Sequence, residues 1–291
     1  MSAEVLRYAA FTLDGRGGNP AGVVLDAGSL TDPQMLAIAQ AIGYSETAFV
    51  VPGADSPLQP TLRFFSPVAE VPFCGHATVA TAVALAERQG TGVIEMSTQA
   101  GPVSVTTRNE DGDLVATLTS PPTTTRQVEA SVLDETLAAL RWTHDDLDSR
   151  YPAHVAFAGN QHLVLGLRSR ETLARLDYDY AALEAVMARQ RWTTAHLFWS
   201  ETATTFHVRN PFPPGGVVED PATGAAAAAF GGYLRDLRLV PLPAQLSLHQ
   251  GHDMGSPSLL LVDVAPDTAT VRVTGHATRL ALSPYDELER L

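Results

Sequence analysis

The same short motif occurs twice in this chain of 291 residues, once in each half. Glu70-x-Pro72-x-x-Gly75 and Glu219-x-Pro221-x-x-Gly224 lie 149 residues apart at all three positions. The same spacing relates three further pairs of identical residues: Ala77 and Ala226, Leu85 and Leu234, and Phe49 and Phe198. Repetition over half the chain predicts two domains of the same architecture.

Each copy of the motif leads into an alanine-rich helix, which we expect at Ala77–Arg88 and again at Thr223–Arg235. Side chains this small on every face suit a helix enclosed by a sheet, because a surface helix carries charges on one face. Short runs rich in Val, Thr and Phe, ended by Gly, Pro or Asp, predict many strands and few helices. We therefore predict an α+β fold of two pseudo-symmetric domains, each a curved β-sheet or barrel around a central helix.

The segment Thr119–Thr125 is the best candidate for a linker between the halves. Its two prolines and its run of threonines are not expected to continue a helix or an internal strand. We place the N-terminal domain at residues 1–122 and the C-terminal domain at 123–291, with the last strand able to pack back on the first domain. Further helices are predicted at Met35–Ile42, Asp134–Arg141 and Tyr180–Arg189.

Charge excludes several classes of function. The net charge is −13, and all 19 basic residues are Arg, with no Lys. A chain without Lys can form no Schiff base and has no Walker-type phosphate loop. Strong acidity also argues against binding to nucleic acid or to an anionic membrane surface. A small molecule is the expected partner.

Cofactors, metals and export are not indicated either. The single cysteine, Cys74, permits no internal disulfide and no zinc site built on two thiolates. We also discount the pair His249-x-x-His252, a pattern of low specificity, and we find no dinucleotide-binding glycine motif. The N-terminus lacks a secretory pattern and no apolar run could span a bilayer, so a cytoplasmic location is expected.

The starts of the two alanine-rich helices are candidate anion sites, since unpaired N–H groups and the helix dipole favour negative charge there. If the two halves face each other, Gly75-His76-Ala77 and Thr223-Gly224-Ala225 converge on one crevice that suits a small carboxylate. The alternative is that these ends are merely capped, with Asp220 and Thr223 satisfying the second helix.

Glu46 is the candidate proton carrier. It lies at a turn into an apolar strand, and its counterpart in the second repeat is Ala195, so the repeated scaffold does not require a carboxylate there. His76, at the first helix start, could hydrogen-bond a substrate or share its proton. Taken alone, Glu46 also fits a solvated turn residue, His76 a structural donor, and Cys74 a small buried hydrophobic residue.

Several motifs resemble those of the PhzF family of phenazine-biosynthesis-like isomerases, which belongs to the diaminopimelate epimerase-like superfamily. The residues that carry the resemblance span nearly the whole chain: Gly18-Asn19-Pro20-Ala21, Ser45-Glu46-Thr47-Ala48, Phe65-Ser66-Pro67, Glu70 to Thr78, Glu219 to Gly224, Gln250-Gly251 and Met254 to Ser258.

The resemblance implies a cofactor-independent isomerase, without metal, whose active site lies between two equivalent domains and which usually forms a homodimer. It implies that Glu46 is the general acid/base, with His76 and Asp220 as polar partners. We expect substrate contacts from Asn19, Gly75, Ala77, Thr223, Gly224 and Ala225. Two positions depart from the family pattern: Ala225 replaces a serine and so removes a hydroxyl that would bind substrate, and Ser256 stands where arginine is common.

Three other functions stay open on sequence grounds. The missing hydroxyl at Ala225 suggests a non-catalytic small-molecule-binding protein on the same fold. A two-base amino-acid epimerase would need two opposed thiols, and the counterpart of Cys74 is Thr223, a far weaker acid and base. A hydrolase or lyase could use Glu46 to activate water.

Overall fold

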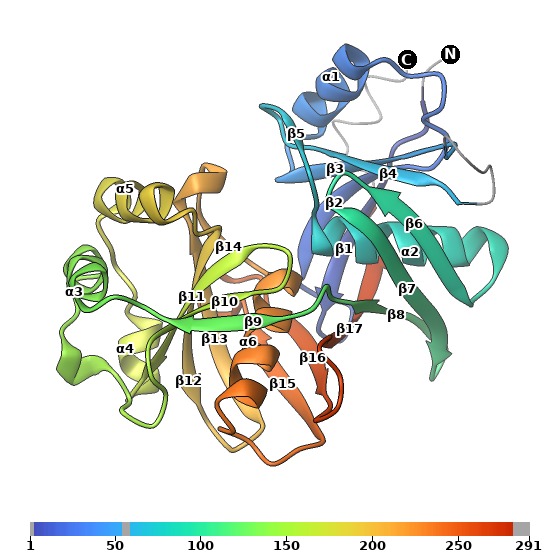
Figure 1. Cartoon of the computed structure of the whole chain (residues 1–291). Coiled ribbons are helices and arrows are strands. Elements are labelled where there is room, and N and C mark those ends of the chain that lie inside the picture. The colour runs from blue at the N-terminus through green and yellow to red at the C-terminus, as the bar shows by residue number, and fades with distance from the viewer. Residues whose placement is uncertain (1–2, 54–58, 282–291) are drawn as a thin grey trace. The chain divides into compact units, whose positions relative to one another are not determined.

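The internal duplication is visible in how the chain divides. The computed structural model describes residues 3–53 and 59–281. They form two units: one runs to Leu118 and takes up the chain again from Gly275, and the other is Thr119–Thr274 (Figure 1). Our predicted boundary after residue 122 falls just inside the second unit.

The first unit winds its strands around one helix. Its elements are β1 (Leu6–Thr12), β2 (Asn19–Val24), α1 (Asp32–Ile42), β3 (Glu46–Val51), β4 (Thr61–Phe65), β5 (Glu70–Val71), α2 (Gly75–Gln89), β6 (Val93–Thr98), β7 (Gly101–Glu110) and β8 (Asp113–Thr119). β1–β2, β3–β4, β4–β5, β6–β7 and β7–β8 pair antiparallel. β2–β3 and β4–β6 pair parallel, which requires the crossovers that contain α1 and α2.

The second unit repeats this pairing. Its elements are β9 (Thr124–Gln127), α3 (Ala130–Ala139), β10 (His154–Phe157), β11 (Gln161–Leu167), α4 (Arg170–Ala174), α5 (Tyr180–Gln190), β12 (Thr194–Ser200), β13 (Thr205–Phe212), β14 (Val217–Asp220), α6 (Gly224–Asp236), β15 (Ala244–Gln250) and β16 (Ser258–Val264), with 3₁₀ turns at His144–Asp146, Pro213–Gly215 and His252–Met254. The last strand, β17 (Arg272–Arg279), begins in this unit and ends in the first. β11–β12 and β13–β15 are its parallel pairs. β17 pairs with β16 up to Thr274 and with β1 from His276 onward.

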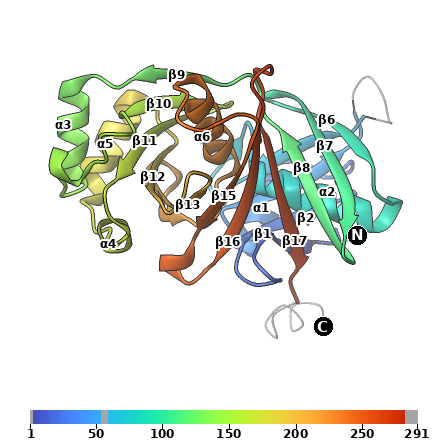
Figure 2. The same ribbon diagram turned by 90° about the horizontal axis from the view of Figure 1, so that it is seen from below.

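Each central helix is enclosed, as predicted. Every residue of α2 from Gly75 to Ala86 is buried, and so is every residue of α6 from Ala226 to Leu234. Gly232 shows why the side chains are small, because a Cβ there would lie 2.3 Å from the Thr123 hydroxyl. Figure 2 shows α6 among the strands of the second unit.

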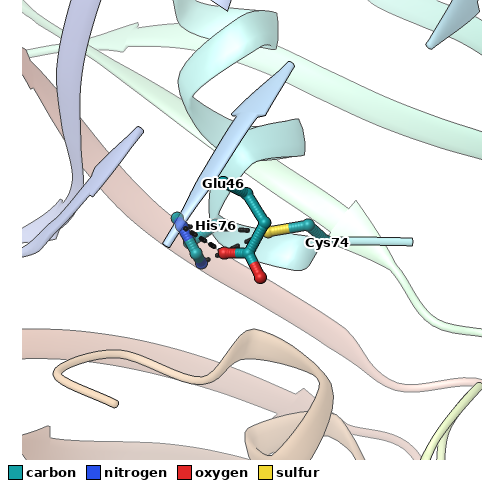
Figure 3. A group of neighbouring side chains, drawn as sticks. All are labelled: Glu46, Cys74 and His76. Atoms are coloured by element: carbon teal, nitrogen blue, oxygen red, sulfur yellow. Dashed lines mark hydrogen bonds and ion pairs between the residues drawn. The ribbon is translucent and has the colours of Figure 1, made fainter. Parts of the chain in front are cut away.

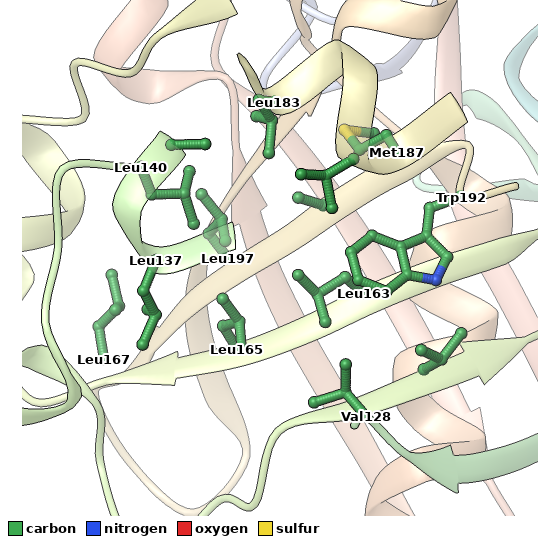
Figure 4. Close-up of a cluster of buried hydrophobic side chains, with 14 of the residues drawn as sticks. Val128, Leu137, Leu140, Leu163, Leu165, Leu167, Leu183, Met187, Trp192 and Leu197 are labelled. Carbon is green, nitrogen blue, oxygen red and sulfur yellow. The ribbon is translucent and has the colours of Figure 1, made fainter. Parts of the chain in front are cut away.

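Some central strands are buried on both faces, because the enclosed helix covers one face and outer helices cover the other. In β11, Leu163, Leu165 and Leu167 point away from α6 and pack under α3 and α5, together with Trp192 (Figure 4). In the first unit, α1 covers a smaller cluster that includes Phe49. Apolar residues in unbroken runs therefore mark these central strands.

The predicted linker is shorter than expected. We placed it at Thr119–Thr125, and the division between the two units does fall at Thr119, but Thr124 and Thr125 begin β9 and pair with Phe157 and Ala156 of β10. Only the prolines lack a backbone donor, whereas threonine favours strands once a partner edge is available.

None of the described helices combines the length and apolar character that a membrane crossing requires.

Candidate active site

Three elements of the first unit bring Asn19, Glu46 and His76 together. Asn19 is the first residue of β2 and Glu46 the first of β3. Because these strands are parallel, with Ala21 opposite Glu46, their starts lie at the same edge of the sheet. His76 is the second residue of α2, and its ring lies 3.5 Å from the Glu46 carboxylate.

Glu46 lies against the imidazole of His76 (Figure 3). The distance from His76 Nε2 to Glu46 Oε2 is 3.5 Å, and Ser45 Oγ lies 3.4 Å from the same nitrogen. The His76 side chain is 6% exposed and that of Glu46 is 14% exposed. The pair is thus shielded from bulk water, but the carboxylate keeps some access from outside.

Asn19 sets the proton position on the His76 ring. Its Nδ2 lies 3.1 Å from His76 Nδ1, in a fully buried contact. An amide nitrogen can only donate, so Nδ1 accepts and the ring proton lies on Nε2. The N–H of His76 therefore faces Glu46 and Ser45.

Cys74 is closer to the His76 ring than its sequence context indicated. It is buried, as predicted, but its Sγ lies 3.4 Å from His76 Nδ1 and 3.8 Å from His76 Nε2. Sequence reasoning also missed Ser45. The signals were present, since Cys74 precedes His76 by two residues and Ser45 flanks Glu46, but neither reveals a contact without the fold.

The second unit holds Asp220 in a separate hydrogen-bonded turn. Thr223 donates its hydroxyl to Asp220 Oδ2 at 2.6 Å. Gln250, which is 1% exposed, accepts from the Thr223 N–H and donates to the Asp220 carbonyl oxygen at 2.7 Å. Gly251 must be glycine, because its φ is +74° and a Cβ would lie 2.1 Å from the Ser256 carbonyl oxygen. The Gln250-Gly251 motif thus fixes the Asp220 turn.

The predicted substrate-binding backbone lies at the two helix starts. Gly75 and Ala77 are buried in the first turn of α2, and Gly224 is buried at the start of α6, followed by Ala225. The side chains of the N-cap residues, Cys74 and Thr223, accept no hydrogen bond from the helix they precede. The alternative that the Thr223 side chain caps α6 is therefore wrong, because its hydroxyl donates to Asp220 instead.

An arginine–glutamate pair braces the turn before each central helix. Arg63 donates Nε and Nη2 to the two oxygens of Glu70, at 2.7 and 2.8 Å. Arg209 and Glu219 repeat this pairing in the second unit, with the shortest contact at 2.5 Å. The glutamates of the duplicated motif therefore hold the turns in place.

Two buried histidines lie on the neighbouring strands β11 and β12. His162 Nδ1 lies 2.8 Å from the Thr194 hydroxyl, and His196 Nδ1 lies 3.2 Å from Asn210, the residue that pairs with Asp220 across β13 and β14. Burial lowers the pKa of His162 to about 3, with a smaller contribution from the neighbouring His196. Burial also lowers the pKa of His196, to about 4, although the hydrogen bond to Asn210 Oδ1 opposes this shift.

These pKa values predict acid sensitivity. An unfolded chain binds protons on both rings below about pH 6.5, whereas the folded chain does so only near pH 4 and below. Stability should therefore fall as the pH drops from 6.5 to 4, by about 1.4 kcal/mol per pH unit for each ring. Denaturant titrations of the wild type and of His196→Gln should show a flatter slope for the variant in this window. Free energies of unfolding would be compared with their values at pH 8, where both rings are neutral. An equal fall in the two proteins between pH 6.5 and 4 would contradict the lowered pKa of His196.

The fold assigns the chain to a class of known proteins. A hydroxyproline epimerase from Agrobacterium vitis is similar in structure, with a TM-score of 0.66 at 14% identity over 95% of this chain and 91% of that one. The chain thus has the diaminopimelate epimerase-like fold. A PhzF family protein of Bacillus anthracis is more similar, with a TM-score of 0.86 at 25% identity over 97% and 98% of the two chains.

Sequence comparison gives the family. The model of the phenazine biosynthesis-like protein family matches residues 8–282. An uncharacterised isomerase of Mesorhizobium japonicum is 32% identical over 95% of this chain and 96% of its own. The trans-2,3-dihydro-3-hydroxyanthranilate isomerase of Pseudomonas chlororaphis is 31% identical over 89% of this chain and 90% of its own. The chain belongs to the phenazine biosynthesis-like (PhzF) family and is one of its isomerases, as the motifs predicted.

Proposed function

We propose that this isomerase shifts a proton between two carbons of a small carboxylate-bearing metabolite, with Glu46 as the acid/base. The observation that carries this proposal is the Glu46–His76 contact at the start of an enclosed helix. The second repeat has Ala195 and Ala225 at the two equivalent positions. The shared fold therefore does not explain this pair, and a chemical role does.

The contact geometry suits proton transfer in both directions. The Glu46 carboxylate would take a proton from a C–H bond and return it to another carbon on the same face. The N–H on His76 Nε2 stabilises the carboxylate before the transfer. At 3.5 Å this contact is longer than the 2.7–2.9 Å of a strong charge-assisted hydrogen bond. Glu46 can therefore turn to the substrate without breaking a strong bond.

Backbone N–H groups are the natural partners of the substrate carboxylate. The first turn of α2 presents Gly75 and Ala77 beside His76, and the helix dipole adds a positive partial charge there. We also propose Asn19, Thr223, Gly224 and Ala225 as substrate contacts, and Asp220 as a polar partner of Glu46 in catalysis. Since Ala225 offers no hydroxyl, we expect the preferred substrate to differ from the one in the name of the Pseudomonas chlororaphis relative.

Hydrogen exchange tests this function directly. Enzyme in deuterated water should introduce solvent deuterium at carbon into its substrate, because the proton on Glu46 exchanges with solvent between turnovers. A panel of small unsaturated carboxylates, including trans-2,3-dihydro-3-hydroxyanthranilate, would be followed by NMR. Binding with neither deuterium uptake nor isomer formation anywhere in the panel would support the non-catalytic alternative.

The thiol alternative has its own test. In a two-base epimerase Thr223 would have to act opposite Cys74, but its hydroxyl is engaged with Asp220. We therefore expect Cys74→Ser to keep most of the deuterium uptake and to lose modest stability, because a hydroxyl is more polar than the buried thiol that it replaces. Complete loss of uptake in a folded Cys74→Ser protein would instead favour thiol-based epimerisation. Circular dichroism provides the check on folding.

A further inference from the structure

Three chemically different metal ligands meet at the start of α2. One ligand atom each of Glu46, Cys74 and His76 lies within 4.8 Å of the other two. All three side chains point toward one another in Figure 3. Counted over the whole residue, Cys74 is 7% exposed and His76 is 5% exposed. We propose that this cluster binds a borderline-soft divalent cation such as Zn²⁺, and that the cation inhibits the enzyme.

The spacing of His76 and Glu46 matches one edge of a tetrahedral zinc site. With Zn–N and Zn–O near 2.0–2.2 Å, a tetrahedron places nitrogen and oxygen about 3.4 Å apart. Here His76 Nε2 lies 3.5 Å from Glu46 Oε2. Cys74 Sγ lies 3.4 Å from Nδ1 and 3.8 Å from Nε2, so it lies beside the ring and not in line with the Nε2 lone pair. To bind the same ion, the Cys74 side chain would turn about its Cα–Cβ bond, and the fourth position would take water.

The donor set selects the kind of metal. A thiolate, an imidazole and one carboxylate suit Zn²⁺ and Co²⁺, whereas Mg²⁺ and Ca²⁺ prefer oxygen ligands alone. The helix start also favours the thiolate, because the positive end of the α2 dipole lies beside Cys74. We expected no metal from the sequence, because the chain has a single cysteine, His249-x-x-His252 is a pattern of low specificity, and the family resemblance implies none.

Asn19 would support the metal-bound form. The cation needs the lone pair of His76 Nε2, so the ring proton must move to Nδ1 and the Cys74 thiol must release its proton to solvent. Nδ1 would then be the donor, and a turned Asn19 amide would present Oδ1 as its acceptor. Metal-bound histidines usually donate their second N–H in this way.

Inhibition rests on the proposed function, whereas metal binding does not. An ion on Glu46 Oε2 and His76 Nε2 would occupy the atoms that hold and stabilise the transferred proton. Zn²⁺ should therefore suppress deuterium uptake, and a chelator should restore it. Failure of the uptake assay alone would count against the proposed function and leave the metal site standing.

Cobalt spectroscopy tests the site without substrate. Cys74 is the single cysteine of the chain, so a thiolate-to-cobalt charge-transfer band in the near ultraviolet reports this residue alone. Titration of the chelator-treated full chain with Co²⁺ should produce the band with one equivalent, and Zn²⁺ should displace it. Cys74→Ser should lose the band and bind Zn²⁺ more weakly, by more than the roughly 10–100-fold that loss of an outer-shell partner costs.

A surface cluster of imidazoles provides the matched control. In the second unit, His249 lies 5.3 Å from His207 and 5.5 Å from His252, measured between ring centroids. The double variant His249→Ala/His252→Ala should keep the band and bind Zn²⁺ within about threefold of the wild type. If Cys74→Ser misfolds, Glu46→Gln is the deciding variant. It should keep the charge-transfer band, because Cys74 is intact, and should bind Zn²⁺ more weakly than the wild type. Cobalt bound without the band, or unchanged Zn²⁺ affinity in both Cys74→Ser and Glu46→Gln, would overturn the proposal.

Discussion

Replacing Glu46 with Gln should lower the rate of solvent-deuterium incorporation by about 10²–10⁴-fold, the usual contribution of a positioned acid/base. The amide keeps the size of the side chain and can still accept from the N–H of His76, but it cannot carry a proton. The fold should be unchanged, because Glu46 lies at the first position of β3 and the β3 residues that pair with β4 are untouched. The measurement is NMR of the substrate in deuterated water.

Ser45→Ala is the matched control for this site. Ser45 precedes Glu46 and also lies beside His76 Nε2, at 3.4 Å, but its hydroxyl carries no charge. Loss of one neutral hydrogen bond costs about 1 kcal/mol, so the rate should fall by less than about tenfold. If Glu46→Gln and Ser45→Ala lost the same modest amount, Glu46 would be a structural residue and the mechanism would be wrong.

Much of the fold was predictable because the duplication repeats its local signals. Gly75 and Gly224 mark the starts of α2 and α6, and the absence of charged faces on both helices predicted their enclosure. The short α4 and the strand character of Thr124–Gln127 were missed. Both depend on tertiary partners: α4 is capped by Ser169 over a single turn, and β9 exists because the edge of β10 is available.

Two features of the sequence pointed to the site. Glu46 was identified because Ala195 replaces it in the second copy, and His76 because it lies at the start of an alanine-rich helix. The contacts of Asn19 and Cys74 with the His76 ring were not predicted. The sequence places these residues at a strand start and a helix cap, but it does not show which way their side chains point. That both helix starts serve one carboxylate stays a prediction.

Glu219→Gln should be the most destabilising single change among the charged residues discussed above. Glu219 and Arg209 are 4% and 12% exposed at the side chain, and the guanidinium also donates to the carbonyl oxygens of Leu173 and Ala174. The variant leaves a nearly buried positive charge facing an amide that can accept with only one atom. Breaking a buried pair from one side costs about 3–5 kcal/mol, a large part of the 5–15 kcal/mol of a typical protein.

The duplicated pair in the first unit makes this prediction specific. Glu70→Gln removes the equivalent carboxylate, but Arg63 is 22% exposed and keeps Asp32, whose oxygen lies 2.7 Å from Nη1. Its loss should be nearer the value of about 1 kcal/mol seen for pairs open to water. Urea denaturation of both variants measures the difference directly. Equal losses would mean that the two turns tolerate the missing charge alike, and that burial around Arg209 does not decide the strength of its pair. A larger loss for Glu219→Gln would show that the turn leading to Asp220 depends on its ion pair more than the turn leading to His76 does.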